Sequence, residues 1–393
     1  MMMKTMLMSQ LNRVKRKIKK IDFRERDIVT INPDAEIKGN VLISYIIGPF
    51  LLKPGQLVSN SHTNQWECLQ IAKTFLVLGY SVDIISWNNQ KFVPKRNYSF
   101  FIDIHNNLER LSPLINQDCV KILHITGAHW LFQNQAEYGR LLALQQRRGI
   151  TLIPRRIVPS SMGIEHADFA TIKGNQFTIN TFRYAQKPTY RIPTSTPVLH
   201  PWQEDKDYEA CRNRFLWLGG GGMVHKGLDL VLEAFAEMPE YHLTVCGSVQ
   251  SEKDFENAFY RELYQTPNIH TIGWIDVSSS KFLEITKNCI GLIYPSCSEG
   301  CSGSVVACLH AGLIPIVSYE SGVDVNDFGF ILKDCSINEI KNSVKTLSSL
   351  STQELELRAK KAWEFARENH TREKFSEAYR HFVTDVLGVR GEN

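Results

Sequence analysis

The sequence contains no run of about 18 consecutive apolar residues, the length that a membrane-spanning helix requires. The first twenty residues also lack the order of a signal peptide, because the charges from Arg13 to Lys20 come after the Met-rich stretch. We therefore expect no transmembrane span, no secretory leader and a cytoplasmic location.

The nine cysteines include no C-x-x-C pair and are odd in number. This pattern argues against a disulfide framework or a zinc site and favours reduced thiols in a cytosol. Cys297, Cys301 and Cys308 lie close together in sequence, but cysteine also behaves as a small buried apolar residue, and we interpret them in that way. No metal site is predicted.

Positive charge is concentrated at the N-terminus, where residues 1–38 hold ten Lys or Arg against five Asp or Glu. Between Leu7 and Ile21, apolar residues recur at steps of three and four with basic residues between them. An amphipathic helix with a cationic face would suit the surface of an anionic membrane. A solvated helix packed on its own protein, or a disordered tail, explains the pattern equally well. Nucleic acid is not an expected partner, because basic and aromatic residues do not alternate in the body of the chain.

A chain of 393 residues is too long for one ordinary core, so two domains are expected. From about residue 40, short apolar runs alternate with helical stretches, which predicts βαβ units around parallel sheets. A proline-rich stretch without periodicity, residues 185–209, indicates an interdomain linker. Strands are predicted at 41–47, 81–87, 99–104, 120–126, 149–154 and 177–182 in the first half, and at 214–220, 241–247, 268–274, 289–296 and 313–319 in the second.

The predicted architecture is therefore α/β, with two doubly wound domains and a cleft between them. We predict five segments: a basic extension at 1–38, an N-terminal domain at 39–190, a linker at 191–210, a C-terminal domain at 211–371 and a terminal helix at 372–393.

Four consecutive glycines, Gly219 to Gly222, follow the predicted strand 214–220 and precede a helix. They allow the backbone to approach a ligand closely, and free N–H groups at the next helix start favour an anion. Lys226 adds a positive charge that suits a diphosphate. A flexible glycine turn with a solvated lysine explains the same residues equally well, because the spacing is not that of a G-x-G-x-x-G fingerprint.

The stretch "SCSEGCSGSVVACLHAG" (296–312) places Glu299 in a loop between a buried strand and a helix. A carboxylate there can accept two hydrogen bonds from vicinal hydroxyls, and the helix start at Ser302–Val305 offers free N–H groups to an anion. The small residues around it leave space. Together with the glycine turn, these features favour a nucleoside diphosphate joined to a hydroxyl-rich group.

Several polar residues of the first half follow predicted strands or precede a helix. His124 and His129 lie at and beyond a strand's carboxyl end, where we expect them to face the cleft, and His105 and Asn106 have the same placement. His62 lies in a polar run that could bind an acceptor or cap a helix. A structural role as hydrogen-bond partners is the alternative for these histidines.

The segments "FLWLGGGGMVHKGLDLVLEAF", "NIHTIGWI" and "GLIYPSCSEGCSGSVVACLHAGLIPIVS", with the closing helix, resemble retaining GT-B-type glycosyltransferases of family 4 (glycosyl transferases group 1). The resemblance covers the whole second half in order and the first half more loosely. It implies two Rossmann-like domains facing across a cleft, a nucleotide-sugar donor on the C-terminal domain, and a last helix that crosses back. It also implies transfer with retention of the anomeric configuration, no essential metal and no cofactor besides the donor substrate.

The resemblance also implies roles for individual residues. Lys226 would neutralise the donor diphosphate, Glu299 would hold hydroxyls of the donor sugar, and His124 would approach the reacting carbon. The resulting donor-binding set is Gly219, Gly220, Gly221, Lys226, Glu299, Gly300, Ser302, Gly303 and Ser304, the last three contributing backbone N–H groups. The acceptor-side set is His129, His105, Asn106 and His62.

Two positions depart from the family pattern. The arginine that is usual six residues before the lysine corresponds to Gly220, and the second glutamate, which would hold the ribose, corresponds to Ala307. Losing one charge-assisted hydrogen bond costs roughly 1.5–3 kcal/mol if nothing compensates.

We predict a metal-independent glycosyltransferase for a glycan or lipid-linked acceptor, as in polysaccharide biosynthesis, peripheral on the membrane if the basic segment binds lipid. The alternative is a non-catalytic nucleotide-sugar-binding or scaffold protein of the same fold. The hypothesis of a nicotinamide-dependent oxidoreductase is supported only by the glycine-rich turns. The glycosyltransferase prediction depends on the Lys226 ammonium and the Glu299 carboxylate converging on one activated sugar.

Overall fold

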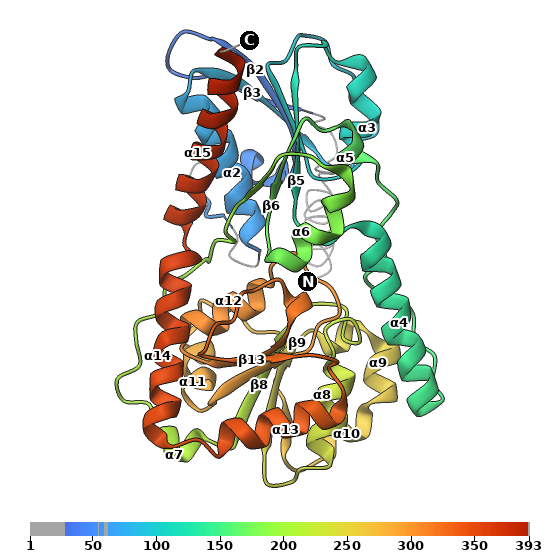
Figure 1. Ribbon diagram of the computed structural model, residues 1–393, viewed down its shortest axis with the longest axis vertical. Helices are drawn as coiled ribbons and strands as arrows, with labels where there is room; N and C mark the ends of the chain where they lie inside the picture. Colours follow the sequence, from blue (N-terminus) through green and yellow to red (C-terminus); the bar gives the residue numbers. More distant parts are fainter. Residues whose placement is uncertain (1–27, 54, 59–61, 392–393) are drawn as a thin grey trace, which may run out of the picture.

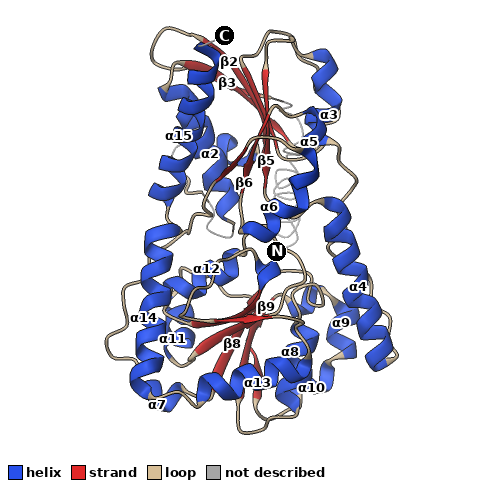
Figure 2. Ribbon diagram, in the orientation of Figure 1, coloured by secondary structure: helices blue, strands red, loops and turns tan. Residues whose placement is uncertain are grey.

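The computed structural model describes residues 28–391, except for 54 and 59–61. Two α/β domains stand end to end, and each is built on a sheet flanked by helices (Figures 1 and 2). The amphipathic segment Leu7–Ile21 lies outside the described residues. No helix of the described part is both long and apolar enough to cross a membrane.

The N-terminal domain contains a seven-stranded sheet with the order β1-β3-β2-β4-β5-β6-β7, parallel except for the β1–β3 pair. Its central strands are mostly apolar and buried, as expected when helices cover both faces of a parallel sheet. The strands are β1 (Val29–Ile31), β2 (Gly39–Tyr45), β3 (Tyr80–Ser86), β4 (Phe100–Asp103), β5 (Val120–Ile125), β6 (Phe169–Ile172) and β7 (Thr189–Arg191). The helices are α2 (Thr63–Val77), α3 (Asn107–Leu111), α4 (Trp130–Arg148), α5 (Gly163–His166) and α6 (Gln176–Phe182).

The C-terminal domain contains a six-stranded parallel sheet with the order β10-β9-β8-β11-β12-β13. The strands are β8 (Arg214–Gly219), β9 (His242–Gly247), β10 (Ile269–Thr271), β11 (Gly291–Tyr294), β12 (Ile314–Ser318) and β13 (Phe330–Leu332). The helices are α7 (Tyr208–Cys211), α8 (Leu228–Ala236), α9 (Lys253–Ala258), α10 (Tyr260–Tyr264), α11 (Ser280–Lys287), α12 (Gly303–His310), α13 (Ile337–Ser348) and α14 (Thr352–Asn369). Short 3₁₀ turns occur at Gly48–Leu51, Ser112–Leu114, Arg183–Ala185, Val249–Ser251 and Tyr319–Ser321.

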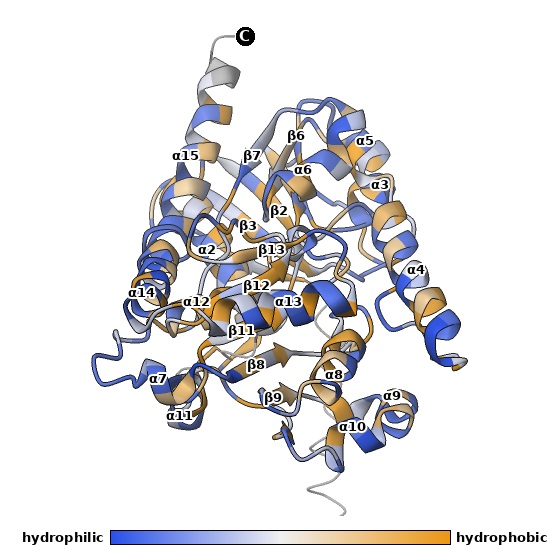
Figure 3. Ribbon diagram, turned by 60° about the horizontal axis from the view of Figure 1, so that its bottom comes forward, coloured by the Kyte–Doolittle hydropathy of each residue, from blue (hydrophilic) through white to orange (hydrophobic). Residues whose placement is uncertain are grey.

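Helix α13 illustrates how local sequence sets an element. Its N-cap Ser336 accepts a hydrogen bond from the backbone N–H of Glu339 at 3.1 Å, which satisfies one of the unpaired amides of the first turn. Ile340, Val344 and Leu347 recur at steps of four and three and are fully buried. The amphipathic surface of this and other peripheral helices is visible in Figure 3.

The last helix, α15 (Arg372–Gly391), leaves the C-terminal domain and packs against α2 of the N-terminal domain (Figure 1). Phe375, Tyr379 and Phe382 are buried in the same apolar cluster as Val41 and Ile43 of β2. The chain therefore crosses between the domains a second time at its end.

Helix α4 makes a further crossing, because its C-terminal half lies on the C-terminal domain beside α8 and α9 (Figure 1). Leu144 is fully buried in the core of that domain, and the segment after the helix packs Leu152 against the same core. Arg147 pairs with Asp229 at 2.7 Å on the facing helix α8. We refer to residues 130–158, which consist of α4 and this segment, as the interdomain strap.

The structure corrects two predicted strands. Residues 149–154 form part of the strap, since Ile150 and Leu152 bury against the other domain and Pro154 has no N–H for a ladder. Residues 177–182 lie in helix α6, whose N-cap Asn175 accepts from the N–H of Phe177 at 3.1 Å. Short apolar runs do not distinguish a strand from a buried helix.

The first sheet uses strands that the sequence pattern did not predict. In the first sheet, β6 and β7 form one edge, in place of segments 149–154 and 177–182, which were predicted as strands. In the second sheet, β13 is an additional edge strand that was not predicted. The predicted boundary at residue 38 is also wrong, because β1 pairs with β3 and belongs to the N-terminal domain.

Candidate active site

The side chains of Lys226 and Glu299 meet where the C-terminal domain faces the N-terminal domain. Lys226 lies in the turn between β8 and α8, and Glu299 lies in the loop between β11 and α12. The Nζ of Lys226 forms an ion pair with Oε1 of Glu299 and donates to the hydroxyl of Tyr294 at 2.9 Å. That hydroxyl in turn donates to Glu299 Oε1 at 2.9 Å. The structure thus brings together the two residues on which the predicted function depends.

Electrostatics keep both groups charged. Burial by itself raises the pKa of Glu299, but the positive charges of Lys226 and Arg156 outweigh it and lower that pKa to about 2. Burial lowers the pKa of Lys226, but the charge of Glu299 more than compensates, and the net shift is upward. Only 9% and 11% of these side-chain surfaces are exposed, so a ligand would contact just a small part of each.

In the glycine turn, Gly220 and Gly221 are exposed to solvent, whereas Gly219 and Gly222 are packed against other residues. A Cβ at Gly220 would have no atom within 4 Å, and both Gly220 and Gly221 are exposed, whereas Gly219 packs against Trp217. Gly222 has φ +88°, a left-handed conformation that a side chain rarely adopts.

At the buried end of the glycine turn, the backbone amides bind the carboxylate of Glu252. The N–H groups of Gly222 and Met223 both donate to the carboxylate of Glu252, the second at 3.2 Å. These two amides therefore already have an anionic partner, and only the exposed glycines remain open to a ligand.

The loop after Glu299 forms one of the contacts between the domains. Gly300 packs against the backbone of Thr126 and Gly127, which follow β5, so closely that no side chain would fit. Its carbonyl oxygen accepts from Oγ1 of Thr178 at 3.0 Å. Gly300 is therefore an interdomain contact in this structure, whereas it was predicted as a donor-binding residue.

The start of helix α12 offers fewer free amides than predicted. The N–H of Ser302 donates to the carbonyl of Ser321 at 2.9 Å, and its side chain caps the helix, so the predicted phosphate contact of this amide is wrong. Among the described residues, the amides of Gly303 and Ser304 have no hydrogen-bond acceptor, and Gly303 is exposed. These two remain candidates for an anion.

His124 does not face the cleft as predicted. Its side chain is fully buried, with Nδ1 at 2.8 Å from Oγ1 of Thr171 and its ring between Tyr45 and Tyr379. Burial, assisted by the charge of Lys173, lowers its pKa to about 3. A neutral imidazole without exposed surface cannot touch a substrate in this arrangement, because the helix α15 that carries Tyr379 covers it.

His129 is the N-cap of α4, and its ring accepts from the N–H of Leu131 at 3.4 Å. Its Nε2 lies 3.1 Å from the hydroxyl of Tyr184, and only 6% of the residue is exposed. Burial lowers its pKa. These contacts favour the structural interpretation over the predicted acceptor role.

The other acceptor-side candidates retain exposed surface. His105 stacks on Trp87, with 5.1 Å between ring centroids, and its Nδ1 lies 2.7 Å from Oδ1 of Asn106. Asn106 donates to the carbonyl of Ser160 at 3.2 Å. His62 is exposed at the start of α2, without a capping hydrogen bond.

The sequence pattern did not predict a network that joins the strap to the turn carrying Lys226. The carboxylate of Glu137, on α4, accepts from the N–H groups of Arg155 and Arg156 at 2.7 and 3.1 Å. Its second oxygen is 2.8 Å from Nδ1 of His225, the neighbour of Lys226. The two adjacent arginines after Pro154 are the only feature of the sequence that hints at this network, and the sequence pattern does not place them beside residue 226.

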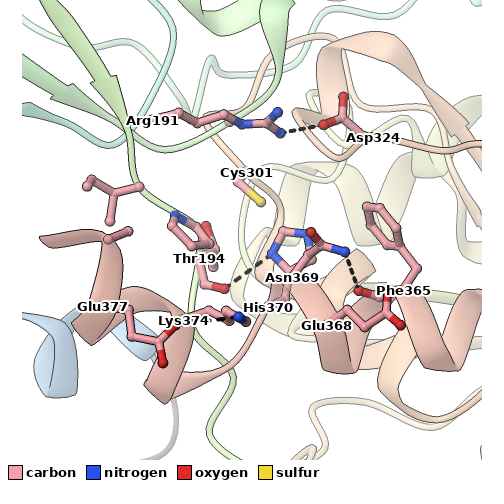
Figure 4. A pocket seen from close by; sticks show the side chains of 14 residues that line it. Arg191, Thr194, Cys301, Asp324, Phe365, Glu368, Asn369, His370, Lys374 and Glu377 are labelled. Carbon is pink, nitrogen blue, oxygen red and sulfur yellow. Dashed lines mark hydrogen bonds and ion pairs between the residues drawn. The ribbon is translucent and has the colours of Figure 1, made fainter. Parts of the chain in front are cut away.

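A cavity of about 410 Å³ lies between the linker and the junction of α14 with α15 (Figure 4). An ion pair between Arg191 and Asp324, at 2.5 Å, crosses it. None of the predicted site residues lines it. Within the described part of the chain, no group of three or more His, Cys, Asp or Glu is placed to hold a metal ion.

Comparison with solved structures settles the fold. Sucrose-phosphate synthase from Thermosynechococcus elongatus matches 90% of this chain and 100% of its own, with a TM-score of 0.63 and 13% identity. The chain has the GT-B fold. A glycosyltransferase from Rickettsia africae matches 89% of this chain and 99% of its own, with a TM-score of 0.60 and 10% identity.

HepE from Anabaena in complex with UDP-glucose matches 89% of this chain and 100% of its own, with a TM-score of 0.55 and 11% identity. No protein-family model and no curated protein sequence matches the chain. The predicted fold class, two Rossmann-like domains in a GT-B arrangement, is confirmed.

Proposed function

We propose that the protein is a glycosyltransferase that moves a sugar from a nucleotide-sugar to a glycan or lipid-linked acceptor, with retention of the anomeric configuration and without an essential metal. The observation that carries the proposal is the contact of Lys226, Glu299 and Tyr294 at the end of the C-terminal sheet that points toward the N-terminal domain. In open α/β sheets, ligands bind at the carboxyl ends of the strands, where this cluster lies. The Anabaena HepE structure of the same fold holds UDP-glucose, which supports a nucleotide-sugar as donor.

These residues would act by stabilising the charge that develops during the reaction. As the bond from the anomeric carbon to the diphosphate breaks and the bond to the acceptor oxygen forms, negative charge accumulates on the leaving diphosphate. The ammonium of Lys226 would stabilise that charge, because it is held in place by Tyr294 and Glu299 before the reaction begins. The second carboxylate oxygen of Glu299 would accept hydrogen bonds from sugar hydroxyls.

The direct test is incubation of the purified chain with a panel of UDP-, GDP- and ADP-sugars. We expect release of one nucleoside diphosphate, slow with water and faster with an acceptor glycan. NMR of the product would give the anomeric configuration. Absence of release from every donor, with and without acceptors, would contradict the proposal.

A non-catalytic nucleotide-sugar-binding or scaffold protein remains the second candidate, and one observation favours it. Ala307, at the position of the expected ribose-binding glutamate, is 3% exposed within the apolar core of α12 and so offers the ribose no polar group. Binding of a nucleotide-sugar without turnover in the panel experiment would support this candidate.

The basic N-terminal segment gives a separate prediction. Deletion of residues 1–22 should release the protein from vesicles that contain phosphatidylserine, because the removed basic residues each contribute about 1 kcal/mol near an anionic surface. Activity on a soluble acceptor should not change. Co-sedimentation that is equal with and without the segment would contradict membrane docking.

A further inference from the structure

The strap places a second cationic side chain over the glycine turn. Cγ and Cδ of Arg156 lie 2.6 and 2.9 Å from the position that a Cβ at Gly222 would occupy, so the side chain lies against this glycine. Arg156 comes from the N-terminal domain, whereas Gly222 and Lys226 belong to the C-terminal domain. Any substitution at Gly222 would displace it.

The guanidinium of Arg156 is free to bind a ligand. Arg156 is exposed, and the side chain makes no hydrogen bond and no ion pair with the residues that the structure describes. Its backbone is fixed instead, since its N–H donates to Glu137 at 3.1 Å and its carbonyl accepts from Gln133 at 2.9 Å. Its neighbour Arg155 differs, because its guanidinium is paired with Asp254 at 2.5 Å.

The charges around the glycine turn show what this arginine contributes. Lys226 is neutralised by Glu299, and the carboxylate of Glu252 caps the turn, so without Arg156 these groups carry a net negative charge. A diphosphate would be repelled by such a site. The charge of Arg156 also acts on both members of the Lys226–Glu299 pair, which places it within interaction range of the same space.

We propose that Arg156, supplied by the interdomain strap, is a donor-binding residue whose guanidinium contacts the diphosphate beside Lys226. This inference rests on the proposed function and deepens it. A planar guanidinium can donate two parallel hydrogen bonds to phosphate oxygens, which the ammonium of Lys226 cannot. It would supply a basic group to the glycine turn, which has none at Gly220.

The test is calorimetric titration of the full-length protein with UDP, GDP and ADP and with the matching monophosphates. We expect Arg156→Ala to raise the Kd for the diphosphate by about 10- to 100-fold, as expected when one charge-assisted contact is lost. The Kd for the monophosphate should rise less. Arg156→Lys should fall between wild type and Arg156→Ala, since it keeps the charge but not the two-pronged geometry.

Arg155→Ala is the matched control, because it removes an equal charge from the same strap without touching the free guanidinium. Its Kd should stay within about twofold of wild type. Circular dichroism should show all variants folded, since the backbone bonds at residue 156 do not depend on the side chain. Equal affinity of wild type and Arg156→Ala for the diphosphate would overturn the inference and leave the proposed function intact. If the wild type binds none of the three diphosphates, the proposed function itself fails, and the inference fails with it.

Discussion

Replacing Lys226 by methionine should lower kcat/KM for sugar transfer by at least about 100-fold, the loss expected when one group that stabilises the developing charge is removed. Methionine has nearly the volume of lysine, so the packing beside Tyr294 is preserved. The same change leaves the Glu299 carboxylate with hydroxyl donors and no ammonium partner. The loss of a partner from a buried ion pair is strongly destabilising, by about 3 kcal/mol.

A double-variant cycle separates the two effects. Glu299→Gln alone should also lower kcat/KM and stability, but the combination with Lys226→Met should recover most of the stability, because no unpaired charge remains. Activity should not recover, since neither group is available to the donor. The measurements are steady-state transfer rates and melting temperatures for all four proteins. Recovery of activity in the double variant would show that the pair serves only to hold the fold.

The convergence of Lys226 and Glu299 could be predicted because it follows from sheet topology. Both residues come after strands of a parallel sheet, and those strands, β8 and β11, are neighbours. The carboxyl ends of neighbouring parallel strands lie at one edge, so the loops that follow them meet. Apolar runs and glycine turns were sufficient to predict the two strands, and the family resemblance predicted that both side chains converge on one ligand. The order of the strands and the direct ion pair were not predicted.

Arg156 and the strap could not be predicted in this way. The contact between Arg156 and Gly222 joins residues of different domains, and no periodicity encodes how two domains dock. Ile150 and Leu152 have the same apolar pattern whether they enter a sheet or cover a neighbouring core, so the pattern predicted a strand. His124 also could not be placed from the sequence. It does lie near the end of β5, but Tyr379 of the last helix covers it.

A second large effect is expected at the buried pair of Glu67 and Lys173, which joins α2 to the end of β6. The Nζ of Lys173 lies 2.6 Å from Oε2 of Glu67, and the N–H and hydroxyl of Ser195 in the linker both donate to Oε1 at 3.0 Å. Lys173→Met leaves a carboxylate that is fully buried with only Ser195 as donor. We expect a loss of about 3–5 kcal/mol and a melting temperature lower by about 10 °C in calorimetry.

Lys361→Met is the control for this change, because its pair with Asp327 is exposed on both sides. Its melting temperature should stay close to that of the wild type, as the exposed pair contributes about 0–1 kcal/mol. Equal melting temperatures for Lys173→Met and Lys361→Met would contradict the assignment of a stabilising pair.

The pH dependence of the free energy of unfolding shows whether ionised Glu67 stabilises the folded protein. Burial raises the pKa of Glu67, but the charge and hydrogen bond of Lys173 outweigh burial, and the net pKa is lowered in the folded state. A carboxyl whose pKa is lowered on folding stabilises the protein fully above its unfolded pKa of about 4.3 and loses that contribution as the pH falls through the folded value. The wild type should therefore lose more stability on acidification below about pH 4 than the double variant Glu67→Gln/Lys173→Met, in which no carboxyl titrates at this position. Parallel losses in the two proteins would show that Glu67 has the same pKa in the folded and unfolded chain, and the pair would then contribute nothing to the stability.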